Sequence, residues 1–495
     1  MSADLLSGSP ATTQPSVVDH EDHRTRGVAA VVLLALLLAL VLRFSALHLG
    51  NQDTWFHLVL GDRFRHGWSL GHPGAPTPFA TADWVPTQWS TEVVASWFES
   101  WFGLPGVAWL FGAFYLALVL LTYLSCRRLS ARPLGGALAT ALLVFGVAPV
   151  LSARPQVVSL VLLTVTVGAW LRTAEDGKVR WWLVPMTWGW ATAHGLWSAG
   201  VLLGFVCWIG LVLDGRARGR RAVAMLAVPA LSLGATMLTP VGPRLLTSQL
   251  AVGARTSMIA EWGPTDFRSV PSLAVALMLA LVVALWTRRG RVSWLRLGLL
   301  LLAGGWTILV ARMVSLGAVV LAPLLAEAIG HSMSRARFSL AGRRAGSTRS
   351  TLPPWERAAL LVTAIGYLVA LAVAAPQVVV RPADVPTTMA PRLSALPSGS
   401  TVLVEDGIGG WMEWAVPSVH PVIDGMLDAY PVGYIHRFFD TTKVKPGWRR
   451  FVSRSGARVG VLEAGSPLSA ALHDQLGWRP EAHDGRWVLL RAPSR

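Results

Sequence analysis

The sequence predicts a polytopic α-helical membrane protein with a small α/β domain at its C-terminal end. Three observations lead to this prediction. Of the 495 residues, 53% are hydrophobic and only 14% are charged, whereas a typical soluble chain carries roughly 25% charge. Apolar runs of roughly 20 residues, the length that crosses a bilayer, recur from Val28 onward. From Thr387 the composition changes to shorter strand-like and helical patterns.

Three regions are expected. Residues 1–26 are polar and lack an apolar pattern, which predicts a disordered cytoplasmic tail. Residues 27–375 form the transmembrane domain. Its first run, Val28–Leu47, is longer than a typical signal-peptide core and no clean cleavage site follows, so we expect a retained helix. Residues 376–495 form the α/β domain, about the size of an independent unit.

The distribution of arginine predicts the orientation. Alternate loops between the apolar runs are rich in Lys and Arg, and by the positive-inside rule these loops are cytoplasmic. About eleven spans of roughly 17–25 residues result, with the N-terminus in the cytoplasm and the C-terminal domain extracytoplasmic, in a plasma (inner) membrane. Trp181–Leu213 is counted as two short spans that meet at His194-Gly195 near the outer face. A single span there would put every later loop on the other side.

The net charge of +16 does not indicate nucleic-acid binding. The arginines lie in short loops between apolar runs, and no basic module is interleaved with aromatic residues that stack bases. Anionic headgroups of membrane lipids are the expected partners of these loops. Cys126 and Cys207 give neither a disulfide framework nor a zinc spacing.

Within the C-terminal region, short strands are predicted at Thr401–Glu405 and Val459–Glu463. A helix should run from Pro467 to Leu476, with Ser466 as its N-cap and Gly477 closing it, before a hairpin turn at Gly485-Arg486. Asp406–Gly410 is glycine-rich, but it lacks the Lys-Ser/Thr and the following helix of a P-loop, which excludes one. Asp424-Gly425 is expected to be a plain turn.

The first outer loop, residues 48–104, is the longest polar interruption in the first half of the chain, and long loops are usually functional. Trp55–Phe64 is expected to form a short amphipathic helix at the membrane interface. Asp53 and His57 are four residues apart and would share one helical face, and Gln88 and Glu92 repeat that spacing.

Asp53 is the strongest candidate for chemistry in this loop. A carboxylate beside a membrane is costly unless it is paired or functional, although Asp53 would also suit the first turn of a helix. His57 would orient Asp53, bind a metal or shuttle a proton, or else be solvated. Glu92 is either paired with an arginine or part of the site. Gln88 and Trp89 offer an amide and an apolar ring face to a sugar.

Arg154 and Arg312 lie on the side that arginine otherwise avoids, so orientation does not explain them. A guanidinium suits phosphate or carboxylate oxygens, so we expect either a lipid phosphate or an internal ion pair. Asp53, Glu92 and Glu261 are the possible acidic partners. His194, Glu261 and Trp262 add further polar or aromatic groups at the outer depth.

Short motifs in order along the chain resemble those of bacterial polytopic proteins related to the C-class (GT-C) glycosyltransferases. The motifs are Asp53-Thr54-Trp55-Phe56-His57 with Gly61, Pro78-Phe79 before Trp84, Gln88-Trp89 with Glu92, Ala153-Arg154-Pro155-Gln156, His194-Gly195, Thr239-Pro240 with Gly242, Glu261-Trp262, Gly409-Gly410, Ile423-Asp424-Gly425 and Tyr430.

The resemblance implies a GT-C-like fold and an enzyme that takes a sugar from a polyprenyl-phosphate donor at the outer face. An acid of the first outer loop is typically the catalytic base in that superfamily, and this role carries over to Asp53. The chain departs from the best-known members because Asp53 has no adjacent acid and is followed only by Asp62. The cofactor is therefore left open, with a divalent cation (Mg²⁺ or Mn²⁺) as one option and Asp53 and His57 as its candidate ligands.

The reading that follows is a membrane glycosyltransferase acting on a cell-envelope glycan, lipid or protein. Asp53 would deprotonate the acceptor, while Arg154 and Arg312 stabilise the leaving polyprenyl phosphate. The expected substrate-binding residues are His57, Gln88, Trp89, Glu92, Arg154, His194, Glu261, Trp262 and Arg312. Two alternatives stay open, which are a lipid-linked glycan transporter or flippase and a non-catalytic envelope-assembly protein.

Overall fold

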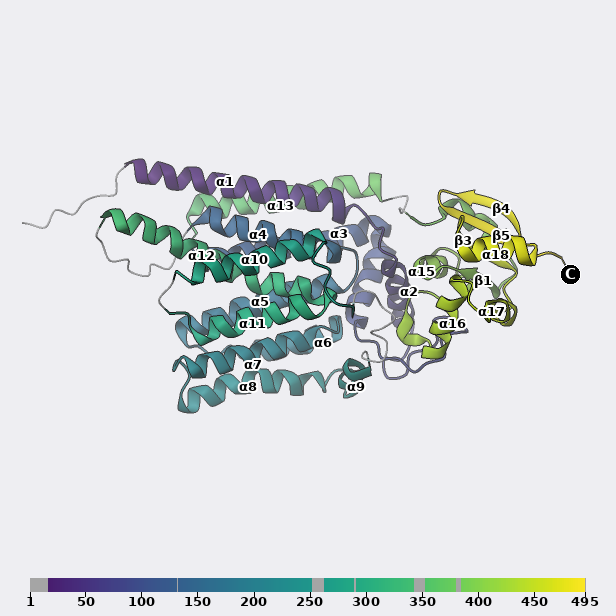
Figure 1. The fold of residues 1–495 in the computed structure, drawn as a ribbon, viewed down its shortest axis with the longest axis horizontal. Helices are drawn as coiled ribbons and strands as arrows, with labels where there is room; N and C mark the ends of the chain where they lie inside the picture. Colours follow the sequence, from purple (N-terminus) through teal and green to yellow (C-terminus); the bar gives the residue numbers. More distant parts are fainter. Residues whose placement is uncertain are drawn as a thin grey trace, which may run out of the picture.

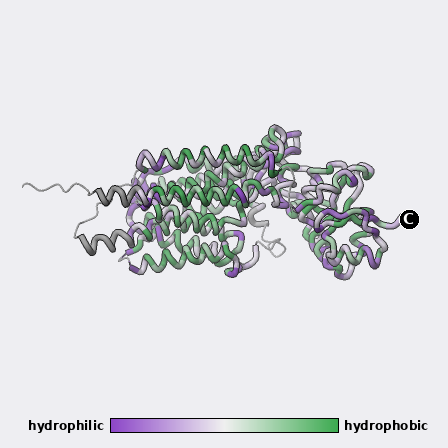
Figure 2. Tube along the Cα trace, turned by 90° about the horizontal axis from the view of Figure 1, so that it is seen from above, coloured by the Kyte–Doolittle hydropathy of each residue, from purple (hydrophilic) through white to green (hydrophobic). Residues whose placement is uncertain are grey.

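Long helices lie side by side along the longest axis of the protein, and a smaller domain with a β-sheet lies at one end of them (Figure 1). The computed structural model describes residues 17–130, 132–251, 262–288, 291–341, 352–379 and 384–494. Six helical segments of these residues are long and apolar enough to cross a membrane, and three shorter apolar helices accompany them. Hydrophobic residues dominate the helical part (Figure 2). The prediction of a polytopic helical membrane protein is confirmed.

The helices of this bundle and of the loops between them follow in chain order. They are α1 (Val17–Val41), α2 (Asp53–Arg65), α3 (Trp89–Leu129), α4 (Pro133–Val147), α5 (Gln156–Asp176), α6 (Leu183–Ala193), α7 (Trp197–Leu213), α8 (Gly219–Thr236), α9 (Arg244–Ala251), α10 (Val270–Trp286), α11 (Trp294–Leu309), α12 (Val314–Ala341) and α13 (Pro354–Val378).

The prediction of a disordered tail is wrong for the second part of residues 1–26. α1 begins at Val17, inside the stretch 1–26, while residues 1–16 lie outside the described residues. Adding residues to an existing helix costs far less than starting one, so the apolar run that follows can extend the helix into a polar segment.

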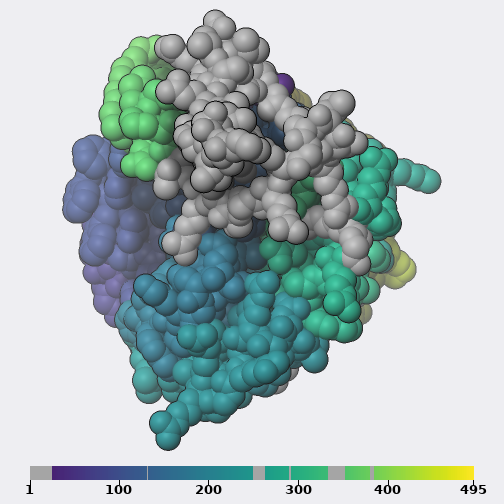
Figure 3. Space-filling model, turned by 90° about the vertical axis from the view of Figure 1, so that its left-hand side faces the viewer, coloured from purple at the N-terminus to yellow at the C-terminus, as the bar shows by residue number. Residues whose placement is uncertain are grey.

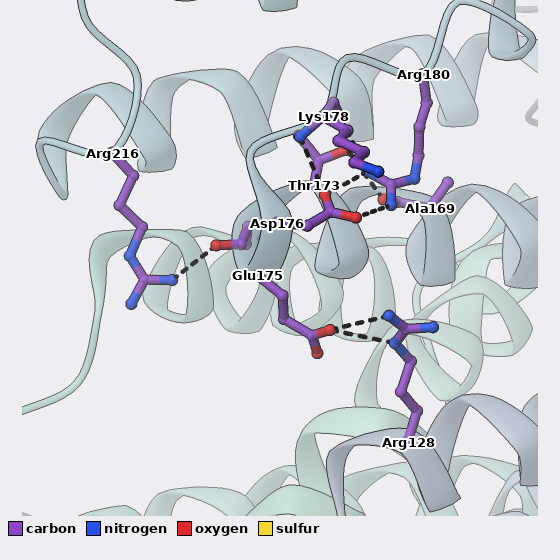
Figure 4. A network of polar contacts seen from close by, with 9 residues as sticks. Arg128, Ala169, Thr173, Glu175, Asp176, Lys178, Arg180 and Arg216 are labelled. Atoms are coloured by element: carbon purple, nitrogen blue, oxygen red, sulfur yellow. Dashed lines mark hydrogen bonds and ion pairs between the residues drawn. The ribbon is translucent and has the colours of Figure 1, made fainter. Parts of the chain in front are cut away.

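One end of the bundle collects the arginines of the alternate loops (Figure 4). Arg128, at the end of α3, donates to Glu175 at 3.1 Å, and Arg180 donates to Asp176 at 2.9 Å. Arg216, which follows α7, donates to the Ala174 carbonyl at 3.2 Å. Seen from this end, α13 lies at the upper left edge, and helices between residues 130 and 230 occupy much of the lower face (Figure 3).

These contacts also settle how Trp181–Leu213 is arranged. α6 starts just after Arg180 and α7 ends just before Arg216, and both arginines contact the last turn of α5. The two helices therefore run in opposite directions and meet at the break at His194-Gly195. The predicted break is confirmed.

Buried ion pairs tie further helices together near the same end. Arg127 of α3 donates to both carboxylate oxygens of Glu356 on α13, at 2.8 and 2.9 Å, and the Tyr123 hydroxyl donates to Glu356 at 2.7 Å. Arg296 of α11 pairs with Glu327 of α12 at 2.6 Å. Both acids are buried, so loss of either guanidinium partner would leave a buried charge uncompensated.

Residues 384–494 contain a five-stranded sheet in the order β2-β1-β3-β5-β4. β1 pairs parallel with β2 and β3, whereas β5 pairs antiparallel with β3 and β4. The elements are α14 (Ala390–Ser394), β1 (Ser400–Val404), α15 (Asp406–Ala415), β2 (Val419–Pro421), α16 (Val432–Thr442), α17 (Trp448–Ser455), β3 (Val459–Glu463), α18 (Pro467–Leu476), β4 (Arg479–Asp484) and β5 (Trp487–Arg491).

The elements predicted here from local patterns are confirmed. The Ser466 side chain accepts a hydrogen bond from the Ser469 N–H at the start of α18, and Gly477 ends the helix with a φ of 68°. β4 and β5 form the predicted hairpin, with Gly485 at a φ of 55°. Asp406–Gly410 is not a loop, because it forms the first turns of α15.

The first outer loop contains helical segments at both of the places where the sequence predicted a helix. α3 begins at Trp89, directly after Gln88, and is interrupted at Gly103, whose φ of 65° lies outside the helical range. α2 is largely covered by protein, because seven of its 13 residues are buried. Most of its apolar side chains therefore pack against protein.

α2 lies between α3 and α15, and glycines allow the close approach on both sides. A Cβ on Gly61 would lie 2.1 Å from the Glu92 carbonyl oxygen of α3. A Cβ on Gly410 of α15 would lie 3.0 Å from the Phe56 nitrogen of α2. The C-terminal domain therefore sits directly on the helix that begins at Asp53.

Candidate functional site

Asp53 and Arg154 form an ion pair at the end of the bundle opposite to the arginine-rich end. Asp53 is the first residue of α2, and its carboxylate accepts a hydrogen bond from Arg154 Nη1 at 3.0 Å. The Asp53 side chain is 28% exposed and that of Arg154 only 9%. The next residue, Thr54, donates to the Ala153 carbonyl at 2.8 Å. Two contacts thus fix the first turn of α2 to the segment before α5.

This geometry decides between two readings of these residues. Asp53 occupies the acid-favouring first turn of a helix, but its carboxylate also binds a guanidinium 101 residues away in sequence. For Arg154, the structure shows the expected internal ion pair with Asp53 and leaves the expected lipid phosphate untested. The half-exposed carboxylate stays accessible, while the guanidinium beside it is mostly screened from water.

His57 and Glu92 form a second pair, one turn further along α2. His57 Nδ1 lies 2.8 Å from Glu92 Oε1, and both side chains are buried. Glu92 was expected either to pair with an arginine or to be part of the site, and the partner that the structure shows is His57. The other carboxylate oxygen, Glu92 Oε2, is buried without a hydrogen-bond partner among the described residues.

His194 lies at the break between α6 and α7 with a defined tautomer. The Leu196 N–H donates to its Nδ1 at 3.3 Å, so Nδ1 is an acceptor and the ring proton is on Nε2. Ser159 Oγ also lies 2.8 Å from Nδ1. Burial lowers the pKa of His194 well below its ordinary value, and nearby Arg312, His57 and Arg154 lower it further. His194 is therefore neutral, and it is close enough to these three residues to be affected by their charges.

Arg312 lies over the ring of Trp262, with 5.5 Å between the guanidinium carbon and the ring centroid. The backbone holds the two segments together, because the Ala311 N–H donates to the Gly263 carbonyl at 3.0 Å. A guanidinium over an aromatic face is attracted by the electrons of the ring. Glu261, the other candidate of this segment, lies outside the described residues.

Gln88 and Trp89 are at the start of α3, one turn before Glu92. Gln88 is the N-cap residue, and its side chain makes no capping hydrogen bond. The indole nitrogen of Trp89 is buried without a partner among the described residues. Their position agrees with a role beside the His57–Glu92 pair, but no contact with Asp53 or Arg154 is seen for either.

Two residues that the sequence did not single out also belong to this region. Gln156 is the first residue of α5 and 1% exposed, and neither of its amide atoms has a partner in the described part of the chain. Asp406 starts α15. Burial raises the pKa of Asp406, as does the charge of Asp53, against the opposing effect of backbone hydrogen bonds. The C-terminal domain thus brings a second acid close to Asp53.

The suggested metal ligands do not converge. Asp53 binds Arg154 and His57 binds Glu92, so the two side chains have separate partners. Among the described residues there is no group of three or more His, Cys, Asp or Glu side chains able to hold a metal ion.

No protein-family model and no curated protein sequence matches the chain. Solved structures do match in fold. The apo oligosaccharyltransferase of Archaeoglobus fulgidus is 11% identical, with a TM-score of 0.53, over 88% of this chain and 69% of that one. ArnT from Cupriavidus metallidurans bound to undecaprenyl phosphate is 14% identical, with a TM-score of 0.52, over 94% and 97%. The apo state of ArnT is 16% identical, with a TM-score of 0.51, over 93% and 97%.

Both similar proteins are GT-C glycosyltransferases, so the resemblance that the sequence motifs indicated holds at the level of the fold. Alignment over 94% of this chain includes both the helical bundle and most of the C-terminal region. At identities this low the likeness concerns the fold alone. The chain has the polytopic fold of the GT-C glycosyltransferases.

Proposed function

We propose that the protein is a membrane glycosyltransferase that moves a sugar from a polyprenyl-phosphate donor to a cell-envelope acceptor. The observation that carries the proposal is the Asp53–Arg154 pair, an accessible carboxylate beside a screened guanidinium at one end of a GT-C bundle. One of the fold neighbours is itself bound to undecaprenyl phosphate, which supports a donor of this class.

In the proposed reaction, Asp53 takes the proton of an acceptor hydroxyl. The acceptor oxygen then forms a bond to the anomeric carbon of the sugar, and the bond from that carbon to the phosphate oxygen breaks. The polyprenyl phosphate leaves as an anion, so it needs positive charge more than a proton. Arg154 and Arg312 supply that charge, and Arg154 does so from a buried position, where electrostatic stabilisation is strongest.

Arg154 would have two partners in turn. In the structure it holds the Asp53 carboxylate, which fixes the base and keeps the guanidinium in place. An arriving phosphate group offers oxygens of the same geometry and competes for the guanidinium N–H groups. Release of Asp53 from Arg154 when the donor binds would strengthen it as a base, and the two events would thereby be coupled.

The remaining residues would position substrates. Glu92 holds the His57 ring, and the neutral His194 presents an Nε2–H donor that suits a sugar hydroxyl. The buried amide of Gln156 adds a donor and an acceptor. We count eleven membrane crossings if α6 and α8 also cross, in addition to the long and the shorter apolar helices. This number would place the site on the extracytoplasmic face together with the C-terminal domain.

The test uses the purified full-length protein in micelles with a radiolabelled polyprenyl-phospho-sugar and an envelope extract as acceptor source. Asp53→Asn keeps the shape and a hydrogen bond to Arg154 but removes the base, so turnover should fall by about 10²–10⁴-fold. Asp62→Asn is the matched control, since Asp62 is an acid on the same helix whose side chain is 57% exposed.

Turnover by Asp53→Asn equal to that of Asp62→Asn would refute the role of Asp53. A wild-type protein that consumes no donor in micelles, yet moves a lipid-linked glycan across a vesicle membrane, would refute the enzyme and favour a transporter. Loss of folding in both variants is checked by thermal unfolding before activity is compared.

A further inference from the structure

The C-terminal domain contains a cavity of about 330 Å³ that the proposed reaction does not use. It is lined by α16, by α17 and by Phe79 from the first outer loop. α17 lies farther from the helical bundle than α2 and α15 (Figure 1). The cavity is thus separate from the region around Asp53, and it is formed jointly by the two parts of the chain.

Aromatic rings form the inner surface of this cavity. Trp448 and Phe451 are buried, while Phe79 and Tyr434 are half-buried. The ring of Tyr434 stacks on Phe79 at 5.8 Å between centroids and contacts Phe451 at 5.4 Å. The Tyr434 hydroxyl donates to the Val422 carbonyl at 2.7 Å, which fixes its ring. Rigid ring faces of this kind present an apolar surface with little loss of side-chain entropy on binding.

Arginines form the rim. Arg437, Arg450 and Arg454 line the same cavity, and all three are exposed. The cavity also contains Asp440, but that carboxylate binds Lys445 at 2.8 Å. No ion pair joins the three guanidinium groups to an acid in the described part of the chain, so their charge is available to a ligand.

The surrounding helices strengthen the positive field. Residues 432–455 contain six Lys or Arg residues against one acid. Charge of one sign around a concave site raises the local concentration of oppositely charged ligands. A guanidinium also pairs in a bidentate manner with carboxylate or phosphate oxygens. The arginine rim therefore favours an anionic group of a ligand, and the aromatic surface below it favours a flat, partly apolar part of the same ligand.

We propose that this cavity binds an anionic saccharide, with its carboxylate or phosphate group on the arginine rim and a sugar ring against the aromatic surface. The volume lies at the lower end of the range for small-molecule sites and suits one or two sugar units. The distance of α17 from the bundle favours a soluble or polymeric glycan over a bilayer headgroup. The proposal does not depend on the proposed transfer reaction.

Binding to the full-length protein in micelles is measured by isothermal titration with four probes. These are a short oligogalacturonate, mannose 6-phosphate, a neutral galactose oligomer and inorganic phosphate. The pocket variant R437Q/R450Q/R454Q is compared with K443Q/R449Q/R486Q, which removes the same charge from exposed residues of this domain that do not line the cavity. Thermal unfolding confirms that both variants fold.

An anionic sugar should bind the wild type, at least about tenfold more weakly to the pocket variant and within about twofold to the control variant. Preference for the galacturonate identifies a carboxylated ligand, and preference for the phosphosugar identifies a phosphorylated one. Phe79→Ala should weaken binding of the sugar but not of inorganic phosphate.

Four outcomes would overturn the proposal. In the first, the neutral oligomer would bind as tightly as the charged one. In the second, both triple variants would lose affinity equally. In the third, inorganic phosphate alone would bind as tightly as the sugars. A fourth is binding only to vesicles of anionic lipid, which would assign the arginines to a membrane surface.

Discussion

Replacing Gly61 by alanine is expected to separate α2 from α3 and to impair the site without substituting a site residue. The added Cβ would lie 2.1 Å from the Glu92 carbonyl oxygen, whereas ordinary contact begins at 3.4 Å. The helices must therefore move apart by about 1.3 Å. A shift of that size takes the 2.8 Å contact between His57 and Glu92 out of hydrogen-bond range.

Two quantities should change. Overpacking of this kind costs about 1–3 kcal/mol of stability, and a displacement of roughly 1 Å in a catalytic site costs about 10²-fold in rate. Thermal unfolding in micelles and donor turnover measure them. Gly366→Ala is the control, because a Cβ there meets nothing within 4 Å and alanine normally stabilises a helix relative to glycine. If Gly61→Ala matched this control in both measurements, the inferred contact between α2 and α3 would be wrong.

Two further predictions concern buried acids. Arg127→Met should destabilise the bundle by about 3–5 kcal/mol in thermal unfolding, because Glu356 stays buried without its guanidinium; the double variant R127M/E356M should recover most of this, and no recovery would contradict the reasoning. Burial and the neighbouring Asp424 raise the pKa of Glu413 above its ordinary 4.5. Because the pKa of Glu413 is higher in the folded protein than in the unfolded chain, protonation of Glu413 stabilises the fold. This stability is lost as pH rises above 4.5. Glu413→Gln should flatten the pH dependence of unfolding, and the exposed Glu463→Gln should not; equal slopes would refute the assignment.

Local signals were sufficient for many elements of this fold. Runs of apolar residues marked the bundle, and capping residues marked α18 to the residue. The break at His194-Gly195 followed from a count of charged loops, not from any helix-breaking residue. Tertiary packing added what local patterns could not show. The pattern of α2 predicted an interfacial helix, and the structure shows that α3 and the C-terminal domain cover much of it; no local signal in the loop indicates a partner more than 300 residues away.

The residues of the candidate site also include some that the sequence predicted and some that it did not. Asp53, Arg154 and Arg312 stand out in sequence because charge beside a membrane is costly, and the structure brings Asp53 and Arg154 within 3.0 Å. Gln156 and Asp406 did not stand out. An amide carries no charge that hydropathy would flag, and Asp406 lies in a domain whose docking cannot be read from the sequence. Gln156 and Asp406 can be assigned to the site only when their burial and their neighbours are known.

The packing of α2 makes the C-terminal domain part of the site. One face of the helix rests on α3 through Gly61, and the other rests on α15 through Gly410, so Asp53 is held by both. The rings of Trp55 and Trp414, 5.0 Å apart, add a contact of the same kind. Since Asp53 begins this helix, any displacement of the domain changes the position of the carboxylate relative to Arg154. The domain therefore positions the proposed base, and its glycine-rich helix packs against α2.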